Sequence, residues 1–145
     1  EPNLAENDLR EVWLTRSGNY GDQSEPTLLA LERLGLAVAQ QDRLNEAIEL
    51  MQLYVRNSLD VYGETYPSRI TALFNAAILM RQSDRREECI ELLLDLRSLC
   101  ELVSEAEIPQ CADLNGFMLT VYNELSQMYP DSDWPEKAKL HEASF

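Results

Sequence analysis

Apolar residues recur along most of the chain at spacings of three and four positions, which is the pattern of amphipathic helices. One stripe of this kind runs over residues 27–40 and a second over 44–61, and the same pair of stripes returns over about 68–82 and 84–102. No stretch alternates between apolar and polar residues for long enough to predict a strand. The pattern therefore predicts an all-α fold built from pairs of helices joined by short turns.

These helix pairs repeat at an interval of 42 residues. The segment 42–50 returns at 84–92 with six of its nine residues identical. The same interval separates segment 20–22 from segment 62–64, and both read Tyr-Gly followed by an acidic residue. Because a single helix pair cannot bury its own apolar stripe, successive pairs are expected to stack on one another.

The interval divides the chain into units of one domain, residues 1–145. About seven helices are expected in all. Residues 1–26 form a partial unit that supplies only a second helix and a loop. Residues 27–67 and 68–109 form two complete units, and residues 110–145 form a stretched third.

The third unit has two alternative alignments with the second. The preferred one places it 49 residues later, matches Ala138 with Cys89, and assigns the seven extra residues to two more turns on its first helix, about 110–127. The other keeps the interval of 42 and matches Tyr122 with Met80.

Local signals predict where several helices begin and end. Gly63 suits a left-handed cap after the helix 44–61, and Pro67 cannot continue that helix. Asp84 with Glu87 has the spacing of a capping box, which predicts a helix start at Asp84.

The first complete unit carries a large residue, a Leu-Gly pair and an apolar residue on its first helix, then a small residue, a large residue and a closing proline: Leu31, Leu34, Gly35, Val38, Ala47, Met51 and Pro67. This set resembles the tetratricopeptide repeat. The interval of 42 residues, the Tyr-Gly-[Asp/Glu]-x-x-Pro loop and the segment Phe74-Asn75-Ala76-Ala77 resemble the kinesin-light-chain subtype. The resemblance implies a right-handed α-solenoid whose first helices line a concave groove.

Small residues recur at one position of the second helices, where two helices are expected to approach closely: Ala5, Ala47, Cys89 and Ala138. The N-terminal helix, about residues 4–17, is expected to pack on the first complete unit through Leu4, Leu9, Val12 and Trp13. No polar cap is visible on its other side, so we expect a fragment of a longer solenoid or an edge that another molecule covers. An open edge of this kind predicts self-association.

The chain carries 12 Lys and Arg against 26 Asp and Glu, a formal net charge of −14. Such a chain repels nucleic acids and anionic membranes and attracts a basic partner, although the charge also serves solubility. No apolar run approaches the length of a membrane span.

The chain has a single histidine, His141, which is expected to be exposed near the chain end. A single histidine excludes most zinc sites and His-dependent catalytic pairs. The five glycines are scattered rather than gathered in a phosphate-binding loop, so we expect no enzyme activity, no cofactor and no metal.

Three cysteines are too few for a disulfide framework, and their odd number favours a reducing compartment. We therefore expect unpaired thiols and a cytoplasmic protein. Cys100 and Cys111 are close enough in sequence to bridge a loop between two helices, which is the less favoured alternative.

The residues beside the packing stripes of the first helices are candidates for contact with a peptide or a partner protein in the groove: Glu32, Leu36, Thr71, Phe74, Asn75, Ile78, Arg81, Gln82 and Asn123. Asn75 matches the asparagine that clamps the backbone of an extended peptide in the resembling family, and its amide can donate and accept at once. The alternative is that Asn75 satisfies a neighbouring helix or water.

The other groove candidates divide by chemistry. Leu36, Phe74 and Ile78 are expected to supply apolar contact, unless Phe74 and Ile78 belong to the helix stack. Glu32, Arg81 and Gln82 are expected to select polar groups. Together these residues predict a protein-interaction module that serves as a scaffold, adaptor or sensor. The alternative is an accessory or regulatory domain of a larger enzyme or signalling ATPase whose catalytic part lies outside this chain.

Overall fold

The computed structural model describes the backbone of residues 2–104 and 106–144 and the side chains of residues 5–104 and 106–144. Over these residues it has seven helices and no strand, which confirms the all-α prediction. The helices are α1 (Pro2–Tyr20), α2 (Glu25–Ala39), α3 (Leu44–Tyr62), α4 (Pro67–Gln82), α5 (Arg86–Cys100), α6 (Gln110–Met128) and α7 (Trp134–Ala143). None of the described helices combines the length and the apolar composition that crossing a membrane requires.

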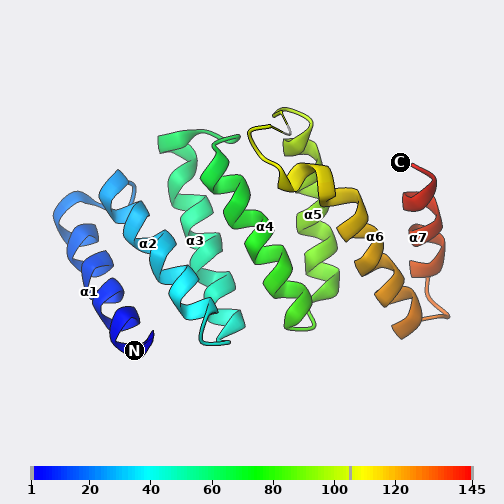
Figure 1. Ribbon diagram of the computed structural model, residues 1–145, viewed down its shortest axis with the longest axis horizontal. Helices are drawn as coiled ribbons and strands as arrows, with labels where there is room; N and C mark the ends of the chain where they lie inside the picture. Colours follow the sequence, from blue (N-terminus) through cyan, green and yellow to red (C-terminus); the bar gives the residue numbers. More distant parts are fainter. Residues whose placement is uncertain (1, 105, 145) are drawn as a thin grey trace.

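Each helix packs against the helices before and after it in the chain, and α4 also touches α6. Figure 1 shows the result, a single row of helices in which neighbours run in opposite directions and the two chain ends lie at opposite ends of the row. Short turns impose this order, because a helix that follows a turn of three or four residues lies antiparallel to its predecessor.

The core follows the repeat. Positions 42 residues apart are buried in both complete units, as in the pairs Leu28 and Ile70, Leu34 and Ala76, Val38 and Met80, Ala47 and Cys89, and Met51 and Leu93. Ala47 and Cys89 are fully buried, as expected for the close contact between the two helices of a pair. At Cys89 the thiol donates a hydrogen bond to the carbonyl oxygen of Ala77 across that contact, at 3.2 Å.

The turn between the two helices of a unit uses the same device twice. Asp42 and Asp84 both have positive φ, at 58° and 61°, a conformation that Asp tolerates better than most residues. The predicted capping box is therefore wrong: Asp84 lies in the turn, α5 begins two residues later, and no side chain caps its first turn. Gly63 follows α3 with a positive φ of 85°, as glycine permits, while Pro67 opens α4 as its first residue.

The third unit is stretched in two places rather than one. α6 has 19 residues against 16 in α4, which is about one extra turn and not the two expected. The turn before α7 is also longer, with five residues (129–133) against three (83–85) before α5. Tyr122 is buried and Tyr129 is exposed, so burial along α6 follows the interval of 42, whereas the buried Ala138 of α7 follows the interval of 49.

Helix α1 packs on α2 through Leu9 and Trp13, as expected, but Ala5 and Val12 are exposed. The Leu4 side chain lies outside the described residues. The residue after Ala5, Glu6, is buried instead. Its carboxylate accepts hydrogen bonds from Arg10, Gln41 and Arg43. This cluster ties α1 to the turn between α2 and α3.

Two expectations about the C-terminal half are wrong. Cys100 and Cys111 form a disulfide with their Cα atoms 5.6 Å apart, which joins the end of α5 to the start of α6 and leaves Cys89 as the free cysteine. The argument for a reducing compartment, which assumed unpaired thiols, loses its basis. His141 is buried rather than exposed: its Nε2 lies 3.1 Å from the carbonyl oxygen of Asn115, and its ring lies against Tyr122.

Candidate functional site

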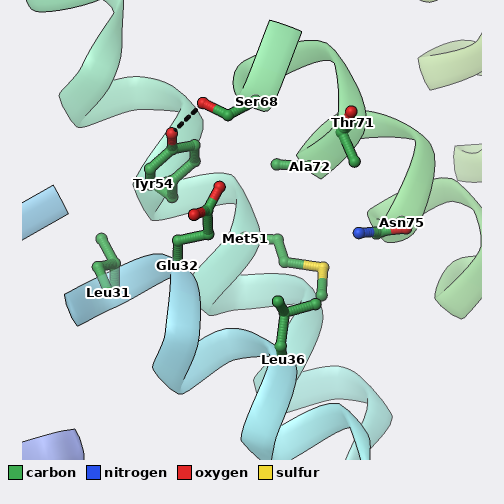
Figure 2. Close-up of a pocket in the computed structure, with 9 residues that line it drawn as sticks. All are labelled: Leu31, Glu32, Leu36, Met51, Tyr54, Ser68, Thr71, Ala72 and Asn75. Atoms are coloured by element: carbon green, nitrogen blue, oxygen red, sulfur yellow. Dashed lines mark hydrogen bonds between the residues drawn. The ribbon is translucent and has the colours of Figure 1, made fainter. Parts of the chain in front are cut away.

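A hollow lies between α2, α3 and α4 and consists of two adjoining cavities. Figure 2 shows the first, which is lined by Leu31, Glu32, Leu36, Met51, Tyr54, Ser68, Thr71, Ala72 and Asn75. The second is lined by Leu36, Ala39, Gln40, Met51, Asn75, Ile78 and Leu79. Because Leu36, Met51 and Asn75 border both cavities, the two form one elongated depression, here called the α2–α4 groove.

The two cavities of the groove differ in size and in openness. The first cavity has a volume of about 70 Å³ and the second, more open one about 310 Å³. Pockets that bury a small molecule enclose roughly 300–1,000 Å³. The narrow first cavity is therefore too small for a drug-sized ligand and suits a single side chain of a longer segment.

Helical periodicity explains which side chains reach the groove. On α2, Leu31 and Leu34 point into the core, while Glu32 and Leu36 lie four positions apart on the neighbouring face. On α4, Thr71, Asn75 and Ile78 have the spacing i, i+4, i+7 that keeps residues on one face. The two helices thus present parallel rows of side chains across α3.

The rim of the groove is apolar and open to solvent. Leu36 is 43% exposed and Ile78 is 42% exposed, whereas Leu34 and Val38 on the same helix as Leu36 are fully buried. Apolar contact from a partner can reach both rim residues without any rearrangement of the core.

Four polar side chains that line the groove make no hydrogen bond with any described residue: Glu32, Gln40, Thr71 and Asn75. Two of these groups face each other across the first cavity. They are the carboxylate of Glu32 and the carboxamide of Asn75, which point toward the centre of the cavity from opposite sides in Figure 2. Burial raises the pKa of Glu32, and the neighbouring Arg33 only partly opposes that effect. Both groups remain available to a ligand.

Tyr54 closes one end of the first cavity. Its hydroxyl is hydrogen-bonded to the hydroxyl of Ser68, which joins α3 to the first turn of α4. Burial raises the pKa of Tyr54 to about 12, and the nearby carboxylate of Glu32 contributes to the rise. The phenol is therefore neutral at physiological pH.

Five of the nine residues expected from the sequence line the groove: Glu32, Leu36, Thr71, Asn75 and Ile78. Phe74 does not, because its side chain is only 5% exposed and belongs to the core. Arg81 is bonded to Glu124 of α6, and Gln82 and Asn123 are exposed but line neither cavity.

Sequence reasoning missed the contribution of the second helix. Met51 and Tyr54 of α3 form the floor and one end of the groove, and Ser68 supports Tyr54. Both α3 residues lie on the apolar stripe of their helix. One feature of the sequence pointed to this contribution: Tyr54 is an amphipathic residue on a stripe that is otherwise mostly aliphatic.

Among the described residues, no group of three or more His, Cys, Asp or Glu side chains could hold a metal ion. A comparison with protein-family models finds no match, and a comparison with curated proteins finds none either.

Proposed function

We propose that this chain is a protein-interaction module that holds an extended segment of a partner protein in the α2–α4 groove. The observation that carries the proposal is the carboxamide of Asn75, which borders both cavities together with the exposed Leu36, and which has no hydrogen-bond partner among the described residues. The proposal assigns no catalytic step and no cofactor to the chain.

Asn75 suits a peptide backbone. An extended segment exposes alternating N–H and C=O groups that need partners once they leave water. A carboxamide donates through its nitrogen and accepts through its oxygen, so one side chain satisfies both groups of a residue. The apolar rim adds the burial of alternate side chains, which supplies affinity.

The arrangement of the helices supports the same proposal. The repeated interval, the antiparallel pairs and the row of consecutive helices are typical of stacked helical repeats, which present extended binding surfaces. We propose that the chain is a right-handed solenoid of the tetratricopeptide type, with α2, α4 and α6 as its first helices.

Selection from a displayed library of random peptides on the immobilised chain tests the proposal. The affinity of an enriched peptide is measured by calorimetry for the wild type and for Asn75→Ala. We expect Asn75→Ala to weaken binding by about tenfold, because a lost hydrogen bond with a desolvated partner typically costs ~1–3 kcal/mol.

Two matched variants serve as controls. Asn123→Ala removes an exposed asparagine that lines neither cavity, and it should leave the affinity unchanged. Ile78→Ala should weaken binding, whereas Leu94→Ala, which removes a similarly exposed apolar residue on α5, should not. Equal affinity of the peptide for all of these variants would rule out the groove as its site.

A further inference from the structure

The carboxylate of Glu32 is partly removed from water without a cation to compensate it. It makes no ion pair and no hydrogen bond with any described residue, although it faces a cavity with largely apolar walls. The nearest basic residue, Arg33, is exposed and follows Glu32 directly in the helix, where consecutive side chains do not face each other. A desolvated carboxylate of this kind favours a positively charged ligand.

Two further tyrosines, Tyr62 and Tyr66, line neither cavity but lie within electrostatic range of Tyr54. The rings of Tyr62 and Tyr66 are stacked with their centroids 4.2 Å apart and their planes 13° from parallel. Burial raises the pKa of Tyr62, and the charges of Glu25 and Glu32 raise it further. The pKa of Tyr54 is also raised mainly by burial, with smaller contributions from Tyr62 and Tyr66. The three phenols and the two carboxylates therefore lie within electrostatic range of one another.

The basic residues near this end are already engaged. Arg69 donates to the backbone carbonyls of Val55, Gly63 and Glu64 and to the hydroxyl of Ser58. Arg16 donates to the backbone carbonyl of Pro26. Neither forms an ion pair with Glu25 or Glu32 among the described residues.

We propose that this end of the groove, lined by Glu32 and Tyr54, is a subsite for a lysine or arginine side chain of the segment that the groove holds. The proposal rests on the proposed function and specifies the partner as a basic segment. The carboxylate pairs with the cation, and the aliphatic stem lies along the apolar wall. The net charge of −14 attracts the same class of partner over longer distances.

Titration of the isotope-labelled chain with N-acetyl-lysine N-methylamide tests the subsite without a peptide. We expect chemical-shift changes at the amides of Glu32 and Tyr54, and similar changes with the arginine analogue. The norleucine analogue, which has the same stem without the charge, should cause none. Equal shifts with norleucine would overturn the proposal.

Glu32→Gln keeps the shape of the side chain and removes its charge. This variant should lower the affinity for the lysine probe by about tenfold, which corresponds to ~1.4 kcal/mol of binding free energy. Its circular dichroism spectrum should stay that of the wild type. Glu91→Gln removes an exposed charge on α5 and should leave the affinity unchanged. An unaltered affinity in Glu32→Gln would place the cation elsewhere.

The pH dependence gives a second readout. The affinity for the lysine probe should fall as the pH drops through the pKa of Glu32, which burial places above its ordinary value. The remaining affinity of Glu32→Gln should not change over that interval. A wild-type profile as flat as that of Glu32→Gln would contradict the role of the carboxylate.

Peptides selected for the groove separate this proposal from the proposed function. Replacement of a selected lysine by norleucine should weaken binding to the wild type and have little effect in Glu32→Gln. If the binding of a peptide requires Asn75, but replacement of its lysine has the same effect in the wild type and in Glu32→Gln, the groove is correct and the cationic subsite is wrong. If no peptide binds and the lysine probe still does, the subsite is correct and the proposed function is wrong.

Discussion

The guanidinium of Arg81 on α4 donates two hydrogen bonds of 2.8 Å to the carboxylate of Glu124 on α6. Arg86, at the start of α5, donates a third bond of 3.3 Å to the same carboxylate. The pair joins two helices that are not neighbours in sequence. Two donors of Arg81 are therefore engaged within the fold, whereas the sequence predicted that this residue selects polar groups of a ligand.

Loss of the pair should loosen α4 against α6. We expect Arg81→Met to lower the free energy of unfolding by about 1 kcal/mol, because a bidentate pair that is partly exposed is worth more than a surface ion pair and less than a buried one. Urea denaturation of Arg81→Met, Glu124→Gln and the double variant measures the coupling. Groove affinity should not change, and a loss of affinity without a loss of stability would return Arg81 to the binding surface.

Arg69 should be a stabilising residue of the same unit. Its guanidinium is buried and satisfies three backbone carbonyls and the hydroxyl of Ser58 where α3 ends. Arg69→Met removes all four hydrogen bonds, although Ser58 Oγ still donates to Val55 and the Tyr66 N–H to Gly63. We therefore expect a loss of about 3 kcal/mol in the free energy of unfolding. Arg33→Met, at an exposed position, should stay within ~0.5 kcal/mol of the wild type by urea denaturation. Similar values for the two variants would contradict this role.

The disulfide between Cys100 and Cys111 should be measurable in two ways. Cross-linking residues 11 positions apart restricts the unfolded chain, so the Cys100→Ser, Cys111→Ser double variant should lose about 2–3 kcal/mol of stability. A thiol-specific reagent should detect one cysteine in the unfolded, unreduced chain. It should detect none in the folded chain, because burial raises the pKa of Cys89 to about 12. Three reactive thiols in unreduced, unfolded protein would show that the bond does not form.

Glu6 should make the attachment of α1 sensitive to acid. Hydrogen bonds from Arg10 and Gln41, with Arg43 nearby, lower its pKa from 4.5 to about 2. A carboxyl group with a lowered folded-state pKa stabilises the fold above its unfolded pKa and loses that contribution as the pH falls toward the folded value. The melting temperature of Glu6→Gln should therefore lie below that of the wild type at pH 7, and the gap should close between about pH 4.5 and 2. Glu11→Gln, at an exposed position of α1, should show no such convergence.

Gly35 should tolerate a methyl group. A Cβ atom there would meet Leu50 Cβ and Met51 Cγ at 3.6 Å, which is ordinary van der Waals contact. Ala77, 42 residues later, occupies the matching position and is fully buried. We expect Gly35→Ala to raise the free energy of unfolding by about 0.5–1 kcal/mol, because glycine is a poor helix former. A lower melting temperature in Gly35→Ala would mean that α2 and α3 cannot adjust even to that contact.

The local pattern was sufficient for the helices themselves. The predicted bounds of α2, α3 and α4 agree with the structure within two residues, because helical hydrogen bonds and the apolar stripe both depend on residues three and four positions apart. The same spacing correctly identified the buried Ala47 and Cys89. It also brought Glu32, Leu36 and Asn75 to one groove, since a repeat that is regular in sequence is regular in space.

Helix periodicity could not decide between neighbouring faces of one helix. Phe74 and Ile78 lie four residues apart on α4, yet one is buried and the other exposed. Their difference depends on which side chains of the neighbouring helices cover each position, which is a matter of interhelical packing and not of spacing. The buried His141 and the paired Cys100 reflect the same dependence, because each meets its partner on another helix.

The sequence by itself determined the number, order and apolar faces of the helices, because those follow from interactions between residues close in the chain. Only the tertiary structure decided that Glu32 has no partner in the described part of the chain, while Arg81 has Glu124, 43 residues away. Charge pairing depends on distances of a few ångströms between side chains on separate helices, and the crossing of α4 with α6 sets those distances.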